Sequence, residues 1–131
     1  MFAGRRPKNL GIRDGRLAAC PAKPNCVCSQ SDSRQHRIEP LRYSGSPERA
    51  MARLQEMVER MPRTSLIDEV EGYLYFQCAS KLLGFVDDLE FYCQPEENCI
   101  HVRSASRLGY SDMGVNRKRV EAIREEFEKE V

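Results

Sequence analysis

Residues 64–106 contain four strand-like stretches in a row, and this run constrains the fold more than any other feature. The stretches are rich in β-branched and aromatic residues, as strands are. They cover residues 64–72, 73–80, 85–93 and 99–106. Short turns separate them, so consecutive strands are expected to pair antiparallel. A fifth strand is expected at residues 36–43, where Pro40 favours an edge position.

A helix is predicted on each side of this run. Ser46 and Pro47 supply an N-cap and a first helical residue for one helix. The other is predicted to run from Asn116, as its N-cap, to the C-terminus, with Val115 and Val120 forming a hydrophobic staple. Each helix has one apolar stripe. The prediction is a two-layer α+β fold in the order β-α-β-β-β-β-α, with an antiparallel sheet of about five strands and both helices on one face.

Residues 1–35 differ from the rest of the chain, because they are rich in Gly, Pro, Ser and Arg and show no periodicity. They are predicted to form an irregular basic arm, packed on a single α+β domain of residues 36–131. Residues 1–45 carry nine Lys/Arg and three Asp/Glu, whereas residues 46–131 carry twelve and seventeen, giving charges of +6 and −5. Such an arm can pack on its own acidic body or dock an acidic partner.

Two observations bear on location and partners. No apolar stretch is long enough to span a membrane, and residues 1–15 lack the apolar core of a signal peptide. A cytoplasmic protein is therefore expected, with export or membrane association as the alternative if a leader was removed. Nucleic acid is not an expected partner, because the sheet region is acidic and no exposed aromatic platform is evident.

The start of the second helix carries charges of the wrong sign. Arg117, Lys118 and Arg119 lie where the helix dipole is positive, and a cation there costs about 0.3–1 kcal/mol. An anion bound by backbone N–H groups and basic side chains would offset this cost. We therefore predict an anion-accepting site at the end of the last strand and the start of this helix. Its residues are Arg103, Ser104, Ser106, Arg107, Ser111, Asp112, Asn116 and Arg119, together with Asp87 and Asp88.

An internal ion-pair network is the alternative, with Asp87, Asp88 and Asp112 holding the arginines. Asp87 and Asp88 are adjacent in a strand and point to opposite faces, so they cannot act as one acid–base pair and one of them is expected to face solvent. A single carboxylate, Asp87 or Asp112, could serve as the base of a hydrolase-like enzyme. The substitution Arg107→Ala separates the first two ideas, since a ligand site predicts lost binding and a network predicts lost stability.

The six cysteines lie in two groups, Cys20, Cys26 and Cys28 in the arm and Cys78, Cys93 and Cys99 in the sheet region. The arm spacing C-x5-C-x-C lacks the second pair of a zinc site, so neither a metal nor a cofactor is expected. A disulfide that pins the arm, a Cys93–Cys99 pair across a hairpin, and buried thiols all remain open. His36 and His101 are isolated in sequence, and no Ser/His/Asp arrangement is assigned.

Three stretches together resemble one family, the domain of unknown function 1499 of bacteria and plastid-bearing eukaryotes. They are residues 17–30, 84–92 and 103–124. The matching positions include Cys20, Pro24, Asn25, Cys26, Asp87, Asp88 and the run 103–119. The resemblance implies that Cys20 and Cys26 are the pair to expect as a disulfide. Cys28 departs from it, since the family usually has serine there, which argues against a three-cysteine site. The resemblance implies no particular activity.

Three functions are thus considered. The first is a binding module for an anionic small molecule or an acidic protein surface. The second is the enzyme with a single catalytic carboxylate, whose arginines would hold an anionic substrate. The third is a structural or assembly factor that docks a partner through the basic arm.

Overall fold

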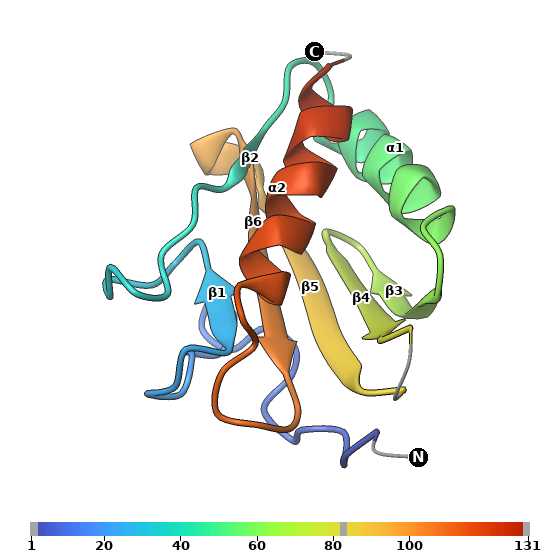
Figure 1. The fold of residues 1–131 in the computed structure, drawn as a ribbon. Helices are drawn as coiled ribbons and strands as arrows, with labels where there is room; N and C mark the ends of the chain where they lie inside the picture. Colours follow the sequence, from blue (N-terminus) through green and yellow to red (C-terminus); the bar gives the residue numbers. More distant parts are fainter. Residues whose placement is uncertain (1–2, 82–83, 130–131) are drawn as a thin grey trace.

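The computed structural model describes residues 3–81 and 84–129 (Figure 1). Its strands are β1 (Cys26–Cys28), β2 (Leu41–Arg42), β3 (Thr64–Val70), β4 (Tyr73–Ala79), β5 (Val86–Gln94) and β6 (Cys99–Ser106). Its helices are α1 (Pro47–Glu59) and α2 (Val115–Glu128), and the 3-10 turn η1 (Pro95–Glu97) joins β5 to β6. Within 3–81 and 84–129, no helix combines the length and apolarity that a membrane crossing requires.

Strands β3 to β6 form an antiparallel meander, as their short connections predict. Strands β1 and β2 both pair with the outer edge of β6, β1 opposite residues 103–105 and β2 opposite residues 99–100. Residues 29–40 form a loop between these two short strands. The α+β class, the antiparallel sheet and the order β-α-β-β-β-β-α are confirmed, with six strands among the described residues.

Two local predictions are wrong at this edge. The strand expected at 36–43 is reduced to β2, because Pro40 restricts the residue before it and the carbonyl groups of Glu39 and Pro40 accept hydrogen bonds from Arg124 instead of a strand. The arm contains β1, which was not predicted. Three residues are too few to show an alternating pattern, and pairing with β6 fixes this strand.

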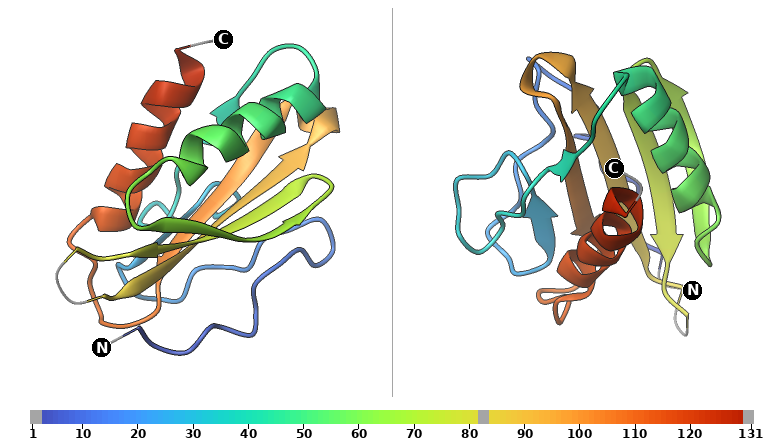
Figure 2. Two further views of the ribbon diagram at one scale, coloured as in Figure 1. Left: turned by 90° about the vertical axis from the view of Figure 1, so that its right-hand side faces the viewer. Right: turned by 90° about the horizontal axis from the view of Figure 1, so that it is seen from above.

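Both helices pack on one face of the sheet, which we call the helix face (Figure 2). Helix α1 begins as predicted, since Ser46 Oγ accepts a hydrogen bond from Arg49 N at 3.1 Å. The core lies between this face and the helices, and burial of each large apolar side chain contributes roughly 1.5–3 kcal/mol. Its fully buried members include Leu54, Val58, Phe76, Leu89, Phe91, Ile100, Val102, Val120 and Phe127.

Helix α2 begins before the predicted N-cap. The cap is Gly114, with φ of 81°, and Val115 is the first helical residue. Asp112 takes the capping role expected of Asn116, because its carboxylate accepts hydrogen bonds from Gly114 N at 2.8 Å and Asn116 N at 3.2 Å. The predicted staple is absent, since Val115 is 47% exposed while Val120 is buried.

The part of the arm before β1, residues 3–25, covers the other face of the sheet, which we call the arm face (Figure 2). Leu17 of this segment is buried against Tyr73 and Tyr75 of β4. Gly11 N donates a hydrogen bond to Glu90 Oε2 of β5 at 2.7 Å. Because both faces are covered, strands β4, β5 and β6 are buried along almost their whole length.

Candidate functional site

The sheet divides the predicted site residues between its two faces. Alternation along β5 and β6 sends Asp87 to the helix face and Asp88 to the arm face. The helix-face cluster consists of Asp87, Ser104, Ser106, Asp112, Asn116 and Arg119. The arm-face cluster contains Asp88, Arg103 and Arg107. The remaining residue, Ser111, lies in the loop between β6 and α2, where its Oγ accepts from Met113 N at 3.2 Å.

Asn116 is the centre of the helix-face cluster and is fully buried. Its Oδ1 accepts hydrogen bonds from Ser104 Oγ at 2.6 Å and Arg119 Nη1 at 2.8 Å. Its Nδ2 donates to Ser106 Oγ at 2.9 Å and Asp112 Oδ2 at 2.8 Å. The amide that was predicted to cap a helix or contact a ligand therefore joins β6, α2 and the loop between them.

The two carboxylates of this cluster are also bound within the chain. Asp87 Oδ2 lies 2.9 Å from Arg119 Nη2, and burial raises the pKa of Asp87 while Arg119 opposes the shift. Burial would also raise the pKa of Asp112, but hydrogen bonds from the Asn116 side chain and from Gly114 N and Asn116 N lower it overall. Asp112 is therefore an ionised cap for α2 rather than a strong base.

Arg107 and Asp88 form the best-made ion pair of the arm-face cluster. Arg107 Nε and Nη2 donate to the two Asp88 oxygens, each at 2.9 Å, which is the bidentate geometry that a guanidinium favours. Tyr75 OH donates to the same carboxylate. The Asp88 residue is only 1% exposed and Asp87 8%, so the expectation that one of this pair faces solvent is wrong. The sequence analysis expected the arm to pack on the domain, but it did not place the arm over this face of the sheet.

Glu90 is a member of this cluster that the sequence analysis missed. Its Oε2 accepts from Gly11 N at 2.7 Å and Tyr73 OH at 2.6 Å, whereas its Oε1 lies 3.8 Å from Arg103 Nη1. Burial raises the pKa of Glu90, and the bonds from Tyr73 and Gly11 oppose that shift. Its position in the strand could have indicated this role, since Glu90 lies on the same strand face as Asp88 and opposite Arg103.

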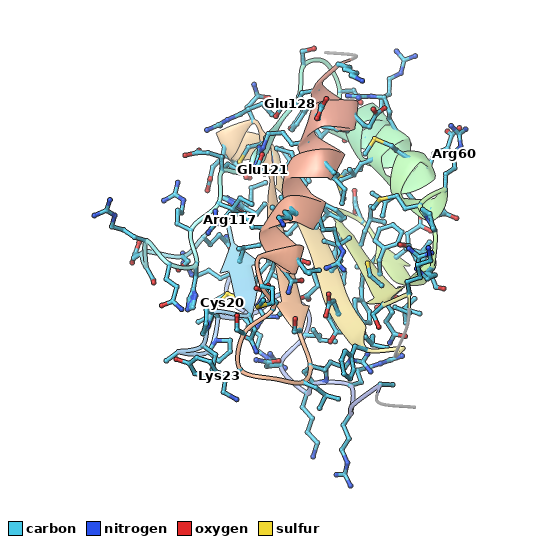
Figure 3. The ribbon with its side chains drawn as sticks, in the orientation of Figure 1. Cys20, Lys23, Arg60, Arg117, Glu121 and Glu128 are labelled. Carbon is cyan, nitrogen blue, oxygen red and sulfur yellow. A yellow bond between two sulfur atoms is a disulfide. The ribbon has the colours of Figure 1, made fainter. Side chains whose placement is uncertain are left out.

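Two cations of α2, Arg117 and Arg124, bind backbone carbonyl groups of the loop between β1 and β2. Arg117 donates to Arg37 O at 2.9 Å and to Gln35 O at 3.1 Å. Figure 3 labels Arg117 on the side of α2 that faces this loop. Farther along the helix, Arg124 donates to Pro40 O at 2.8 Å. The partial negative charge of these carbonyl oxygens thus offsets part of the positive charge of Arg117 and Arg124.

A hollow of about 190 Å³ lies beside the start of α2. Its lining residues are Pro24, Cys26, Val27, Gln35, Ser111, Asp112, Gly114 and Arg117. Ligand pockets usually measure about 300–1,000 Å³. The carboxylate of Asp112 and the guanidinium of Arg117 are already bound to groups of the protein, and Asp112 would repel an anion. The hollow is therefore poorly suited to a ligand with several negative charges.

The cysteines adopt two of the three arrangements that the sequence left open. Cys20 and Cys26 form a disulfide, which ties the arm to β1. Cys28, Cys78, Cys93 and Cys99 are buried free thiols. Cys93 and Cys99 do not pair, because Cys93 contacts Tyr43 in the helix-face core while Cys99 shares the arm face with His101. The sequence analysis did not bring Cys99 and His101 together, although their spacing in one strand was the available signal.

A family model described as "Protein of unknown function (DUF1499)" matches residues 16–127. The matched range contains both clusters, the disulfide and all the strands. No curated protein matches the chain.

Proposed function

We propose that this chain, which belongs to the DUF1499 family, is a binding module that docks an acidic protein surface. The docking surface is the loop between β6 and α2, with the basic residues beside it. The observation that carries the proposal is the exposure of four large apolar side chains within eight positions. Leu108 is 44% exposed, Tyr110 68%, Met113 83% and Val115 47%. Clustered exposed apolar residues mark interaction sites, and Tyr and Met are enriched in interfaces.

The loop is held in place from several sides. Asn25 Nδ2 donates to Gly109 O at 3.0 Å, and Asp112 N donates to Pro24 O at 3.1 Å. Arg107 connects the beginning of the loop to Asp88 and to Gly4 O. A surface already fixed in its binding conformation loses less entropy when a partner binds. The buried ion pairs then serve to position the loop, and the proposal requires no anion between the arginines.

Charge favours an acidic partner over a neutral one. Arg5 and Arg6 are exposed next to Gly4, which accepts a hydrogen bond from Arg107. Lys118 is exposed one turn into α2, where its N–H bonds to Gly114 O. The loop and the start of the arm lie at the same end of the molecule in both Figure 1 and Figure 2. Positive charge around an apolar centre accelerates association with an acidic surface.

The enzyme alternative has less support in this geometry. A general base needs an oxygen within reach of a substrate proton. Asp87 is paired with Arg119 and is 8% exposed. Both oxygens of Asp112 accept hydrogen bonds from the start of α2. Both carboxylates are thus already engaged by groups of the chain, which does not favour either as a base.

Site-specific photo-crosslinking tests the proposal. A benzoylphenylalanine is placed at Tyr110 in cells that produce the protein, with Val70 of β3, which is 56% exposed, as the matched control position. The expected result is a protein crosslinked at Tyr110 and not at Val70, with an acidic surface. Fractionating the cells first also tests the expected cytoplasmic location. Crosslinks to lipid alone, or equal products at both positions, would overturn the proposal.

The crosslinked protein, once purified, allows a binding measurement. Tyr110→Ala combined with Met113→Ala is expected to weaken binding by about tenfold or more, because interface hot spots each contribute over 1 kcal/mol. Val70→Ala is expected to have no effect. The affinity should fall as salt is added, since exposed charges are screened. Binding that is indifferent to salt would remove the acidic partner from the proposal.

A further inference from the structure

Three side chains with metal-binding atoms meet where η1 leads into β6, at the end of the sheet opposite the loop that follows β6. The carboxylate of Glu97, the thiol of Cys99 and the imidazole of His101 place one donor atom each within 4.8 Å of one another. We propose that they form a binding site for a divalent metal ion of the zinc class. The proposal departs from the sequence-based expectation of no metal, which rested on the arm cysteines, and it is independent of the docking loop.

The separations of the donor atoms fit a tetrahedral ion. His101 Nε2 lies 3.0 Å from Glu97 Oε1 and 3.8 Å from Cys99 Sγ, and Cys99 Sγ lies 3.9 Å from Glu97 Oε1. Usual zinc bond lengths with tetrahedral angles separate such donors by roughly 3.3–3.6 Å. Shifts of a few tenths of an ångström would therefore admit the ion.

The local backbone explains how these residues meet. Cys99 and His101 are two positions apart in β6 and so share the arm face of the sheet. Glu97 is the last residue of η1, and Asn98 turns the chain into β6 with φ of 56°. Cys99 and His101 are buried, whereas the Glu97 side chain is 53% exposed. An ion could thus enter from solvent past the carboxylate and be held by the buried thiolate and imidazole.

His101 has the outer-shell partner that metal-binding histidines usually have. Its second ring nitrogen, Nδ1, lies 2.8 Å from Ser29 Oγ, which also accepts a hydrogen bond from Val102 N at 2.9 Å. Ser29 Oγ accepts the backbone N–H of Val102 and can also accept the N–H of His101 Nδ1. With the proton on Nδ1, Nε2 keeps a lone pair for the ion. Partners of this kind orient the ring and strengthen metal binding.

A buried acceptor without a hydrogen-bond donor in the described part of the chain belongs to the residue that pairs with Cys99 across the strands. Gln94 is the cross-strand partner of Cys99, and its Oε1 is buried with no hydrogen-bond donor among the described residues. An unsatisfied buried acceptor is costly in a folded protein. The pairing with Cys99 places this residue next to the cluster, while its Nε2 donates to Gly15 O of the arm at 3.5 Å.

The chemistry of the donors selects the class of ion. A thiolate and a carboxylate balance the charge of a divalent cation, and the mixture of sulfur, nitrogen and oxygen suits zinc or cobalt rather than magnesium or calcium. Three protein donors leave a coordination position for water or another small ligand. The chain Ser29–His101–Glu97 also resembles a nucleophile, base and orienting acid. Ser29 is buried and its oxygen accepts from Val102 N, so a nucleophilic role has less support.

Cobalt titration of the full chain tests the site. Co²⁺ is added without thiol reductant, and the thiolate-to-cobalt charge-transfer band and the tetrahedral d–d bands are recorded. One equivalent of Co²⁺ is expected to produce both bands, and Zn²⁺ to displace it. The wild-type chain failing to bind Co²⁺ or Zn²⁺, or binding them without a thiolate band, would overturn the proposal.

Single-residue variants test whether the thiolate-to-cobalt band comes from the cluster of Glu97, Cys99 and His101. Cys99→Ser is expected to abolish the charge-transfer band, and Glu97→Gln, at an exposed position that folding should tolerate, to weaken Co²⁺ binding at least tenfold. Ser29→Ala is expected to weaken it about 10–100-fold. The matched control is Cys93→Ser, which alters a buried free thiol in the adjoining strand and should leave the titration unchanged. A band that survives both Cys99→Ser and Glu97→Gln would also refute the site.

Discussion

On the helix face, strands β4, β5 and β6 present Phe76, Leu89, Phe91 and Val102 to two helices. On the arm face, the same strands present Tyr75, Asp88, Glu90 and Arg103 to a segment without helix or strand. Both faces are buried, but their partners differ. Apolar burial has no preferred direction, whereas an ion pair requires a particular geometry. The helix face therefore stabilises the fold, and the arm face specifies where the arm and the β6–α2 loop lie.

The ion pairs of the arm face also differ from one another. Arg107 and Asp88 form two hydrogen bonds of 2.9 Å, while Arg103 and Glu90 approach to only 3.8 Å. Removing one partner of a well-made buried pair leaves an uncompensated charge, which is strongly destabilising. Removing one partner of a loosely made ion pair lowers the free energy of unfolding by a smaller amount. The comparison between the faces therefore predicts different costs for changes at neighbouring positions.

The largest effect is expected on the helix face. Phe91 is fully buried and packs edge-on against Phe76, with ring centroids 6.0 Å apart. Phe91→Ala should lower the free energy of unfolding by about 3–5 kcal/mol, through lost burial and the cavity that remains. Urea unfolding followed by circular dichroism measures it, with the exposed residue Ile67 changed to Ala as the control. A loss below about 1 kcal/mol would contradict the assignment of the core to this face.

A smaller effect is expected for the cap of α2, in the polar end of the helix face. Asp112→Asn should cost about 1 kcal/mol at neutral pH, because it removes a negative charge from the start of the helix and replaces an oxygen that accepts from Asn116 Nδ2. Because the folded pKa of Asp112 is lowered, its contribution is full above its unfolded pKa of about 4 and is lost as pH falls through the folded value. The difference between wild type and variant should therefore vanish in acid. A difference that grows in acid would contradict the capping role.

The smallest effect is expected at Glu90, despite its complete burial. Glu90→Gln keeps an oxygen for Gly11 N and Tyr73 OH and removes a charge that is poorly compensated. Burial raises the folded pKa of Glu90, so the charged form is disfavoured at neutral pH relative to the unfolded chain. The free energy of unfolding should change by less than about 1 kcal/mol. A loss above about 3 kcal/mol would mean that Arg103 depends on this carboxylate as Arg107 depends on Asp88.

The two helices that cover the helix face could be predicted from the sequence, although the start of α2 was misplaced, whereas the packing of the arm face could not be predicted. Ser46 and the strands joined by short turns carry local signals, and they led to the correct class, order and first helix. The arm has no periodicity, so its packing over Asp88 and Glu90 depends on long-range hydrogen bonds, such as that from Gly11. No local sequence pattern indicates such long-range contacts.

In the candidate site, too, local features could be predicted from the sequence and long-range contacts could not. The sequence identified the cations at the start of α2 as unusual and offered Asp87 as one acceptor within the alternative of an ion-pair network, but it did not show which cation binds which acceptor. Those acceptors include the carbonyl groups of Gln35 and Arg37 and the carboxylate of Asp87, which are distant in sequence from Arg117 and Arg119. Asn116 was assigned to the cap because Asn commonly caps helices. Its burial depends on Ser104 and Ser106, which only the folded sheet brings beneath it.

The central claim is that the arginines around the β6–α2 loop serve ion pairs within the chain. A double-mutant cycle with Arg107→Ala and Asp88→Asn, followed by urea unfolding, tests it directly. Arg107→Ala alone should cost about 3–5 kcal/mol, because Asp88 would remain buried without its ion-pair partner. The double variant should recover at least about 2 kcal/mol of the sum of the single losses. If Arg107→Ala costs less than about 1 kcal/mol and the two changes are additive, Arg107 is available to an outside partner and the account is wrong.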